Sequence, residues 1–134
     1  MKITVIVPNY NGISILKNCL NSLLSHDRKP DQIVVVDNGS TDGSAGEVRS
    51  GYPSVTLVPL NSNTGFTGAN FAGLKASEGD LIVLLNNDCI VEPGWLKNLE
   101  RRMEEKTVAA VTSSMRNIAN LNIMDSAGGE IDWM

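Results

Sequence analysis

Short aliphatic runs alternate with amphipathic segments along most of the chain. Five runs rich in Val, Ile and Leu predict β-strands, at residues 3–7, 32–37, 55–58, 81–85 and 108–112. Apolar residues at helical spacing predict helices at about residues 13–29, 44–49 and 66–77, with a fourth beginning near Pro93. This alternation predicts an α/β fold with a mostly parallel sheet and helices on both faces.

Five consecutive aliphatic residues form the run Leu81–Leu85. Because the run has no polar alternation, it predicts a central strand that is buried on both faces. Asn86, Asn87 and Asp88 follow it directly. Ligands of open parallel sheets bind just beyond the carboxyl ends of the strands, so these residues are candidates for a binding crevice. A carboxylate beside amide oxygens suits a hard divalent cation.

Two other predicted strands end in loops of similar character, at residues 8–12 and 37–42. The carboxyl ends of parallel strands share one edge of a sheet, so we expect these loops and residues 86–88 to line a common ligand site. Each loop separately also suits an ordinary turn, because Asn, Gly, Ser and Asp are frequent turn residues.

The residue types in these loops indicate a ligand with a nucleobase and phosphate groups. The carboxylate of Asp37 can accept an N–H from a base such as uracil, thymine or guanine. Backbone N–H groups of the Gly and Ser residues that follow it, with a helix beginning behind them, suit anionic oxygens. The formal net charge is −4, so a bound diphosphate needs a bridging cation, for which Asp88 is the candidate ligand.

Composition and charge disfavour several function classes. The 134 residues include no basic run, which argues against nucleic acid as the main partner. No apolar stretch approaches the roughly 20 residues of a membrane span, and Pro8 ends the first apolar run too early for a signal peptide. We therefore expect a cytoplasmic protein, with peripheral attachment to the inner membrane face left open. Cys19 and Cys89 match no metal spacing, and Cys19 is expected to be a core residue.

Four segments together resemble family 2 glycosyltransferases, most closely the rhamnosyltransferase-like and galactosyltransferase-like members. The segments are Ile6-Val-Pro-Asn-Tyr-Asn-Gly12, Val35-Val-Asp-Asn-Gly-Ser-Thr-Asp-Gly-Ser44, Asn63-Thr-Gly-Phe-Thr-Gly-Ala-Asn70 and Leu84-Leu-Asn-Asn-Asp-Cys-Ile-Val-Glu-Pro-Gly-Trp-Leu96. They occur in the family's order, and the resemblance extends from about Ile3 to Trp133. It implies a Rossmann-like GT-A fold and sugar transfer with inversion. The implied donor is a nucleotide-diphosphate sugar, with UDP- or dTDP-sugars favoured, and the acceptor a glycan or lipid-linked molecule in polysaccharide biosynthesis.

The resemblance also assigns site residues. Pro8 and Tyr10 would flank the nucleoside, and Asp37 would hold the base. The loop from Asn63 to Asn70 would approach the ribose and phosphates. Asp88 would bind Mg²⁺ or Mn²⁺ in the family's Asp-x-Asp region, although Asn86 stands where the first carboxylate is expected. The remaining residues expected to contact the donor are Asn11, Asn38, Gly39, Ser40, Asn63, Gly65, Asn70 and Asn87. Ala127-Gly-Gly129 resembles the segment that lies near the donor sugar.

The end of the chain departs from the family pattern. Family members supply an Asp or Glu as general base from a later segment, and the late acids Asp125, Glu130 and Asp132 match no such motif. We therefore interpret residues 1–134 as one nucleotide-sugar-binding domain, the donor half of a transferase truncated at its C-terminus. The apolar residues from Leu121 to Trp133 predict a tail that is poorly ordered or buried in a homo-oligomer contact.

Three other functions are alternatives to this interpretation. A non-catalytic nucleotide-sugar-binding module is the main alternative, since it would share every motif. A receiver-like signalling domain is disfavoured because no lysine follows the last predicted strand. A nicotinamide-binding fold is disfavoured because no G-x-G-x-x-G follows the first strand.

Overall fold

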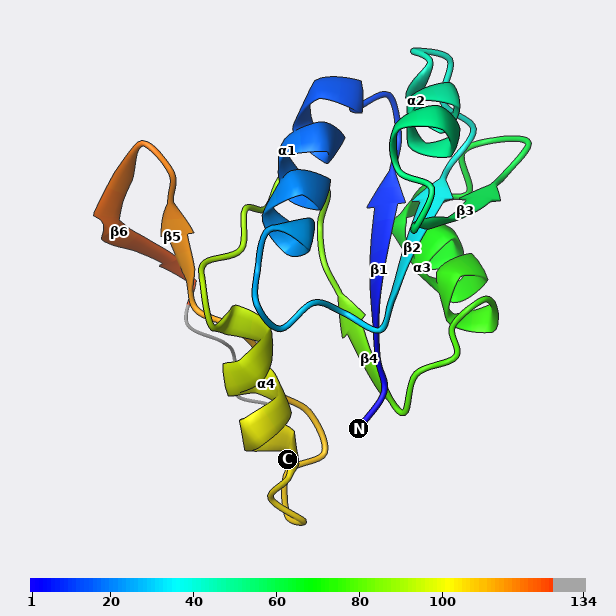
Figure 1. Ribbon diagram of the computed structural model, residues 1–134. Helices are drawn as coiled ribbons and strands as arrows, with labels where there is room; N and C mark the ends of the chain where they lie inside the picture. Colours follow the sequence, from blue (N-terminus) through cyan, green and yellow to red (C-terminus); the bar gives the residue numbers. More distant parts are fainter. Residues whose placement is uncertain (127–134) are drawn as a thin grey trace, which may run out of the picture. The chain divides into compact units, whose positions relative to one another are not determined.

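The computed structural model describes residues 1–126, which divide into two compact units, Met1–Leu96 and a second unit that begins at Lys97 (Figure 1). The elements of the first unit are β1 (Ile3–Asn9), α1 (Ile13–Leu24), β2 (Gln32–Asp37), α2 (Ser44–Gly51), β3 (Thr56–Pro59), α3 (Gly65–Lys75) and β4 (Leu81–Leu84). Helix α4 (Trp95–Met103) begins at the end of this unit, and β5 (Met115–Asn117) and β6 (Asn120–Ser126) belong to the second. The expectation of one domain over residues 1–134 stays a prediction.

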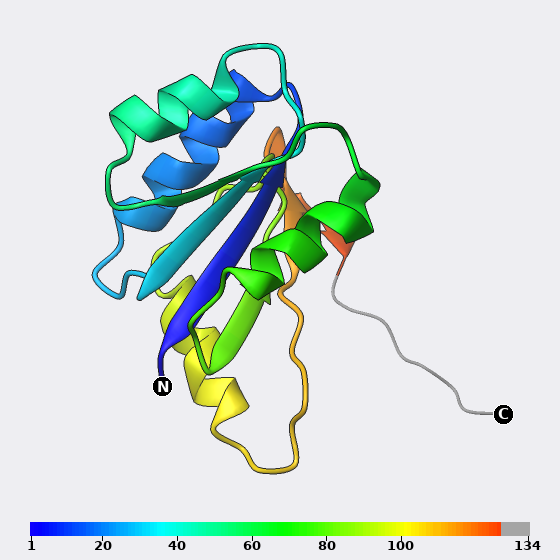
Figure 2. The ribbon, with the colours of Figure 1, turned by 90° about the vertical axis from the view of Figure 1, so that its right-hand side faces the viewer.

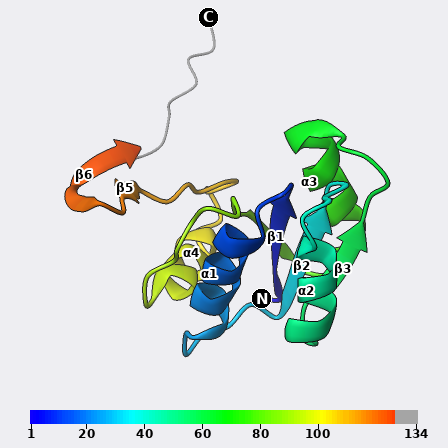
Figure 3. The same cartoon turned by 90° about the horizontal axis from the view of Figure 1, so that it is seen from above.

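The first unit is built on a parallel sheet of four strands in the order β3-β2-β1-β4. Strand β1 lies in its interior, since Val5 is opposite Ile33 of β2 on one side and Val83 of β4 on the other. Helices α1 and α2 cover one face of the sheet and α3 covers the other (Figures 2 and 3). The predicted α/β fold with a parallel sheet and helices on both faces is confirmed.

Alternate residues of β1 supply the two hydrophobic cores, as the two-residue period of a strand requires. Ile3, Val5 and Val7 pack with the apolar side of α1 and with Val48 of α2. Ile6 points to the other face, where it packs with Ala69 of α3. Because both faces of β1 are covered, its run of β-branched residues needs no polar alternation.

Helix α1 is shorter than predicted and ends at Leu24 instead of continuing to Lys29. The backbone N–H of Ser25 closes the last turn on Asn21 O. His26 lies beyond the helix, with Nε2 3.0 Å from the carbonyl oxygen of Val91. The polar residues after Leu24 therefore form the turn that leads to β2, and the predicted extension of the helix to residue 29 is wrong.

Strand β4 is an edge strand of this sheet within the first unit, so the prediction of a central strand buried on both faces is wrong. It pairs with β1 alone, and Leu84 is 56% exposed. The predicted fifth strand at residues 108–112 is also absent from the described structure. The error at β4 arises because an uninterrupted aliphatic run indicates a strand without indicating how many neighbours it has.

The described part of the second unit contains an antiparallel hairpin of β5 and β6, with irregular register. Leu121, Ile123 and Met124 of β6 are each more than half exposed. The segment Ala127-Gly-Gly129, expected near the donor sugar, and the residue Trp133 lie outside the described residues, and a homo-oligomer contact stays a prediction. No helix within residues 1–126 is both long and apolar enough to cross a membrane.

The close packing of α3 on the sheet depends on a glycine. A Cβ at Gly73 would lie 2.3 Å from Cγ2 of Ile6 and 3.1 Å from Cγ2 of Val36. We expect Gly73→Ala to lower the free energy of unfolding by about 1–3 kcal/mol, because overpacking outweighs the better helix propensity of alanine. Gly46→Ala in α2 is the control, since nothing lies within 4 Å of its added Cβ. Equal urea midpoints for the two variants would contradict this account.

Cys19 is fully buried in the core between α1 and the sheet, as predicted. Burial raises the pKa of its thiol to about 12. The unfolded chain ionises this thiol near pH ~8.5, whereas the folded protein keeps the proton. The unfolded state therefore binds fewer protons above that pH, and the stability contributed by Cys19 falls as the pH rises toward the folded pKa.

We expect the stability advantage of the native chain over Cys19→Ala to shrink by about 1–2 kcal/mol between pH ~8 and ~10. Urea unfolding under reducing conditions at several pH values measures this difference. All other titratable groups are the same in the two proteins, so their effects cancel. Parallel stability curves for the two proteins would show that the Cys19 thiol ionises as easily in the folded state as in the unfolded one.

Candidate functional site

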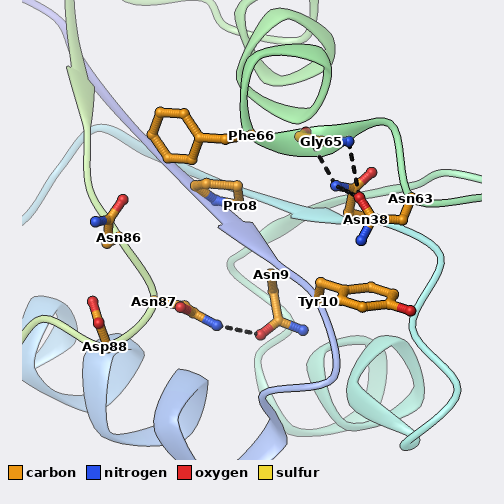
Figure 4. A pocket seen from close by; sticks show the side chains of 10 residues that line it. All are labelled: Pro8, Asn9, Tyr10, Asn38, Asn63, Gly65, Phe66, Asn86, Asn87 and Asp88. Atoms are coloured by element: carbon orange, nitrogen blue, oxygen red, sulfur yellow. Dashed lines mark hydrogen bonds between the residues drawn. The ribbon is translucent and has the colours of Figure 1, made fainter.

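A cavity of about 350 Å³ opens where β1, β2 and β4 end and α3 begins (Figure 4). It is lined by Pro8, Asn9, Tyr10, Asn38, Asn63, Gly65, Phe66, Asn86, Asn87 and Asp88. Asn86, Asn87 and Asp88 lie along one side, and Tyr10, Asn38 and Asn63 along the other (Figure 4). Each of the three predicted loops contributes to this cavity, and the loop before α3 completes it.

Asn38 joins the end of β2 to the start of α3. Its Nδ2 donates to Asn63 Oδ1 at 3.0 Å and to the carbonyl oxygen of Gly65 at 3.2 Å. Its Oδ1 accepts from the backbone N–H of Thr64 at 2.9 Å and from the Thr64 hydroxyl at 3.0 Å. Both amide hydrogens and both lone pairs of Asn38 are therefore engaged within the protein. Asn38 lines the cavity, and its side chain holds the loop before α3 in place.

Asn11 and Ser40 connect the loops after β1 and β2, and neither lines the cavity. Asn11 has a positive φ of 49°, and its Oδ1 accepts from the backbone N–H of Thr41 at 2.8 Å. The Ser40 hydroxyl accepts from the backbone N–H of Asn11 at 3.0 Å. These two residues, predicted to contact the donor, are engaged in loop-to-loop hydrogen bonds.

Asp42 ties the same two loops to the helices behind them. Its Oδ2 accepts from the backbone N–H of Ile13 at 2.9 Å, and its Oδ1 accepts from the backbone N–H of Ser44 at 3.0 Å. The hydroxyl of Ser44, which also donates to this carboxylate, holds the pKa of Asp42 below its ordinary value. Gly43, with φ 89°, is the N-cap residue of α2.

Asp37 is a buried carboxylate at the end of β2. Its Oδ2 accepts from the backbone N–H of Ser40 at 3.2 Å. Its Oδ1 is buried and has no hydrogen-bond partner among the described residues. A buried acceptor without a donor is costly, so a ligand N–H that reached this oxygen would gain binding free energy. Asp37 and Gly39 do not line the cavity.

Asn70 also lies outside the cavity lining, on the buried side of α3. Its Nδ2 donates to the carbonyl oxygen of Phe66 at 2.9 Å, one helical turn earlier. Its Oδ1 is the second buried side-chain oxygen without a partner in the described part of the chain. The hydrogen bond to Phe66 connects Asn70 to the cavity through the first turn of the helix.

Asp88 is exposed at the cavity, with Asn86 and Asn87 lining the same side. No group of three or more His, Cys, Asp or Glu side chains within residues 1–126 is arranged to hold a metal. A single carboxylate with neighbouring amide oxygens does not form a complete protein cage. It does fit Mg²⁺ or Mn²⁺ that keeps several waters and is also bound by substrate phosphates.

Three lining residues were not among the predicted donor contacts: Asn9, Phe66 and Asn86. Asn9 lies in the segment predicted as a loop after the first strand, whereas in the structure it is the last residue of β1. Phe66 is 60% exposed in the first turn of α3, where a helical pattern suggests a packing residue. The feature of the sequence that could have identified Phe66 is a large aromatic side chain directly after Gly65, at the start of a helix. Of the late acids, Asp125 lies in β6, and Glu130 and Asp132 lie outside the described residues.

Comparison with known proteins covers nearly the whole chain. Residues 4–127 match the family described as glycosyl transferase family 2. The chain is 32% identical over 115 residues to the O-antigen chain rhamnosyltransferase RfbN of Salmonella typhimurium, a match that covers 83% of this chain and 36% of that protein.

Two solved structures are similar in fold and sequence. The mannosyltransferase PcManGT from Pyrobaculum calidifontis, in complex with GDP-Man and Mn²⁺, superposes with a TM-score of 0.77 and 27% identity, over 90% of this chain and 37% of that one. TarS of S. aureus, in complex with UDP-GlcNAc, gives a TM-score of 0.67 and 32% identity, over 80% of this chain and 32% of that one. The chain spans between 15% and 40% of the length of curated glycosyltransferases that it matches.

Proposed function

This chain belongs to glycosyl transferase family 2, and from that membership we propose that it binds a nucleotide-diphosphate sugar and takes part in transferring the sugar to an acceptor. It has the GT-A type of α/β fold, with a parallel sheet flanked by helices. The observation that carries the proposal is the cavity at the ends of β1, β2 and β4, where polar side chains from three loops meet. This is the edge at which open parallel sheets bind their ligands.

The nucleoside is proposed to bind on the side of the cavity formed by Tyr10, Asn38 and Asn63. Tyr10 is 51% exposed, so its ring is available to pack against a base or ribose. The buried Oδ1 of Asp37 is the proposed acceptor for a base N–H, since it lacks a donor among the described residues. A base that donated to it would have to enter behind the lining formed by Asn38.

The diphosphate is proposed to lie toward Asp88, whose carboxylate would hold a divalent cation beside it. The residues present fit such a cation, because Asp88 offers a carboxylate beside the amides of Asn86 and Asn87. When bound, Mg²⁺ or Mn²⁺ would neutralise charge on the diphosphate leaving group. The presence of Mn²⁺ with GDP-Man in the structure of PcManGT supports this proposal without identifying the metal for this chain.

The proposed donor is a UDP- or dTDP-sugar. Complexes of TarS with UDP and with UDP-GlcNAc support a uracil base, and the similarity to RfbN supports a rhamnosyltransferase-like branch. PcManGT was solved with GDP-Man, so GDP is included in the binding test below. A glycan or lipid-linked molecule of polysaccharide biosynthesis is the proposed acceptor.

The proposed reaction is an inverting displacement. The bond from the anomeric carbon to the diphosphate oxygen breaks while a bond to the acceptor oxygen forms on the opposite face, and a carboxylate takes the acceptor proton. Asn38 and Asn63 contribute by fixing the wall that orients the donor. We assign the general base to no described residue.

The direct test is isothermal titration of the protein with UDP, dTDP and GDP in the presence and absence of Mn²⁺, followed by an assay of UDP release from UDP-sugars. Tighter binding of UDP or dTDP with Mn²⁺ supports the proposal. Binding without turnover under any acceptor condition would favour a nucleotide-sugar-binding module. Absence of nucleotide binding by the folded protein would overturn the proposed function.

Asp88→Ala should remove the Mn²⁺-dependent part of UDP binding. The change deletes the carboxylate of an exposed residue, so the free energy of unfolding should stay within about 0.5 kcal/mol of the native value. Asp27→Ala is the matched control, because Asp27 is also exposed and lies outside the cavity. If Asp88→Ala still binds UDP as tightly as the native protein does with Mn²⁺, the metal assignment is wrong.

Asp37→Ala should weaken UDP binding by about 1.5–3 kcal/mol, the range for a hydrogen bond to a charged group. Inorganic pyrophosphate has no base, so its affinity in Mn²⁺ should be nearly unaffected. Asp37→Asn keeps the shape and the hydrogen bond from Ser40 while removing the charge, which separates base recognition from loop structure. Equal losses for UDP and pyrophosphate would make Asp37 a structural residue of the turn.

A further inference from the structure

We propose that Asn9 is a positioning residue for the cation site, because its side chain holds the loop that carries Asp88. The Asn9–Asn87 hydrogen bond joins the end of β1 to this loop at 2.8 Å, with Asn87 Nδ2 donating to Asn9 Oδ1. The inference rests on the proposed function, in which Asp88 binds a divalent cation. In this role Asn9 does not touch the cation, and it acts by holding the loop that carries Asp88.

Asn9 is itself firmly held. It is the last residue of β1, is 2% exposed, and is opposite Asp37 in the register with β2. Its carbonyl oxygen accepts from the backbone N–H of Asn38 at 2.8 Å. A side chain on such a backbone has little freedom, so its Oδ1 is a fixed acceptor for whatever lies opposite.

The loop at residues 86–88 has few other attachments to the sheet. The last backbone hydrogen bond from this segment to β1 is donated by Leu85 to Ile6 O at 3.0 Å. Beyond it, Cys89 N–H closes a turn on Asn86 O at 3.2 Å, and the Cys19 thiol approaches the same oxygen at 3.7 Å. Asn87 therefore provides the side-chain connection between β1 and the residue next to Asp88 (Figure 4).

Gly12 leaves the space that this hydrogen bond occupies. A Cβ at residue 12 would lie 2.6 Å from Asn87 Nδ2 and 2.9 Å from Asn9 Oδ1, closer than side chains can approach. The φ of Gly12 is −127°, a value open to any residue, so an alanine there would displace the neighbouring amides without straining the backbone. Gly12→Ala should therefore disrupt the Asn9–Asn87 hydrogen bond while both amide side chains are kept.

Loss of this hydrogen bond should release the loop and lower the fraction of time that Asp88 is placed to bind the cation. Apparent affinity falls in proportion to the binding-competent fraction. Residues that orient a metal ligand typically change metal affinity by roughly 10- to 100-fold when they are replaced. We expect Asn9→Ala to lower the Mn²⁺-dependent gain in UDP affinity by about tenfold, a larger loss than the same change causes without metal.

The experiment measures UDP binding with and without Mn²⁺, by isothermal titration, for the native protein, Asn9→Ala, Asn87→Ala and the double variant. If both amides act through one hydrogen bond, the double variant loses no more than either single variant. Asn18→Ala is the control for loss of an exposed amide on α1 outside the cavity. Gly46→Ala is the control for Gly12→Ala, because its added Cβ meets nothing within 4 Å.

Amide hydrogen exchange of the ligand-free proteins gives a second readout that needs no bound metal. Faster exchange at residues 86–89 in Asn9→Ala and Gly12→Ala, with native exchange in both controls, is the expected result. Native exchange at residues 86–89 in Asn9→Ala would overturn the inference, whatever the binding data. So would an equal loss of UDP affinity with and without Mn²⁺, which indicates a general structural role. If the native protein binds UDP identically with and without Mn²⁺, the metal part of the proposed function fails, and the inference fails with it.

Discussion

The double pairing of β1 is the constraint on which the rest of the first unit depends. Its two edges are hydrogen-bonded to β2 and β4, and its two faces lie under α1 and α3. The start of the strand is held as well, since the backbone N–H of Ile3 donates to Asp31 Oδ2 at 2.8 Å. A strand confined on four sides cannot slide or rotate without breaking both cores. The residues at its carboxyl end therefore reach the cavity in a fixed position, and Asn9 can serve as a reference point for the neighbouring loops.

The apolar pattern predicts an element correctly where burial of that element is the reason for its apolar residues. The run at Gln32–Asp37 is apolar because β2 is buried between two strands and two layers of helices, and its predicted bounds are those observed. The pattern failed where the cause lies elsewhere. The number of neighbours of β4 depends on which segments pair with it, a long-range property that its own residues do not encode. The early end of α1 depends on a turn whose polar residues also suit a helix terminus.

The candidate site was predictable to the level of loops and less so to the level of side chains. Strand ends and turn residues identified where ligands could bind, because the topology of a parallel sheet brings those ends together. The same residue types, however, can face a ligand or bind one another. Asn11 and Ser40 are engaged between loops, whereas Asn87 lines the cavity. Only the backbone path decides between these possibilities, and it is set by contacts far apart in the sequence.

Asparagine amides make up much of the polar surface of the cavity, and this has a consequence for how the pocket responds to its surroundings. An amide neither gains nor loses a proton near neutral pH, so its pattern of donors and acceptors is the same in mildly acidic and mildly alkaline solution. What an amide can do is rotate by half a turn and exchange its oxygen with its nitrogen. At Asn38 the hydrogen bonds to the carbonyl oxygen of Gly65 and from the backbone N–H of Thr64 prevent that exchange. The amide part of the cavity's hydrogen-bonding pattern is thus set by the orientation of neutral groups, and Asp88 is the carboxylate among the residues that line it.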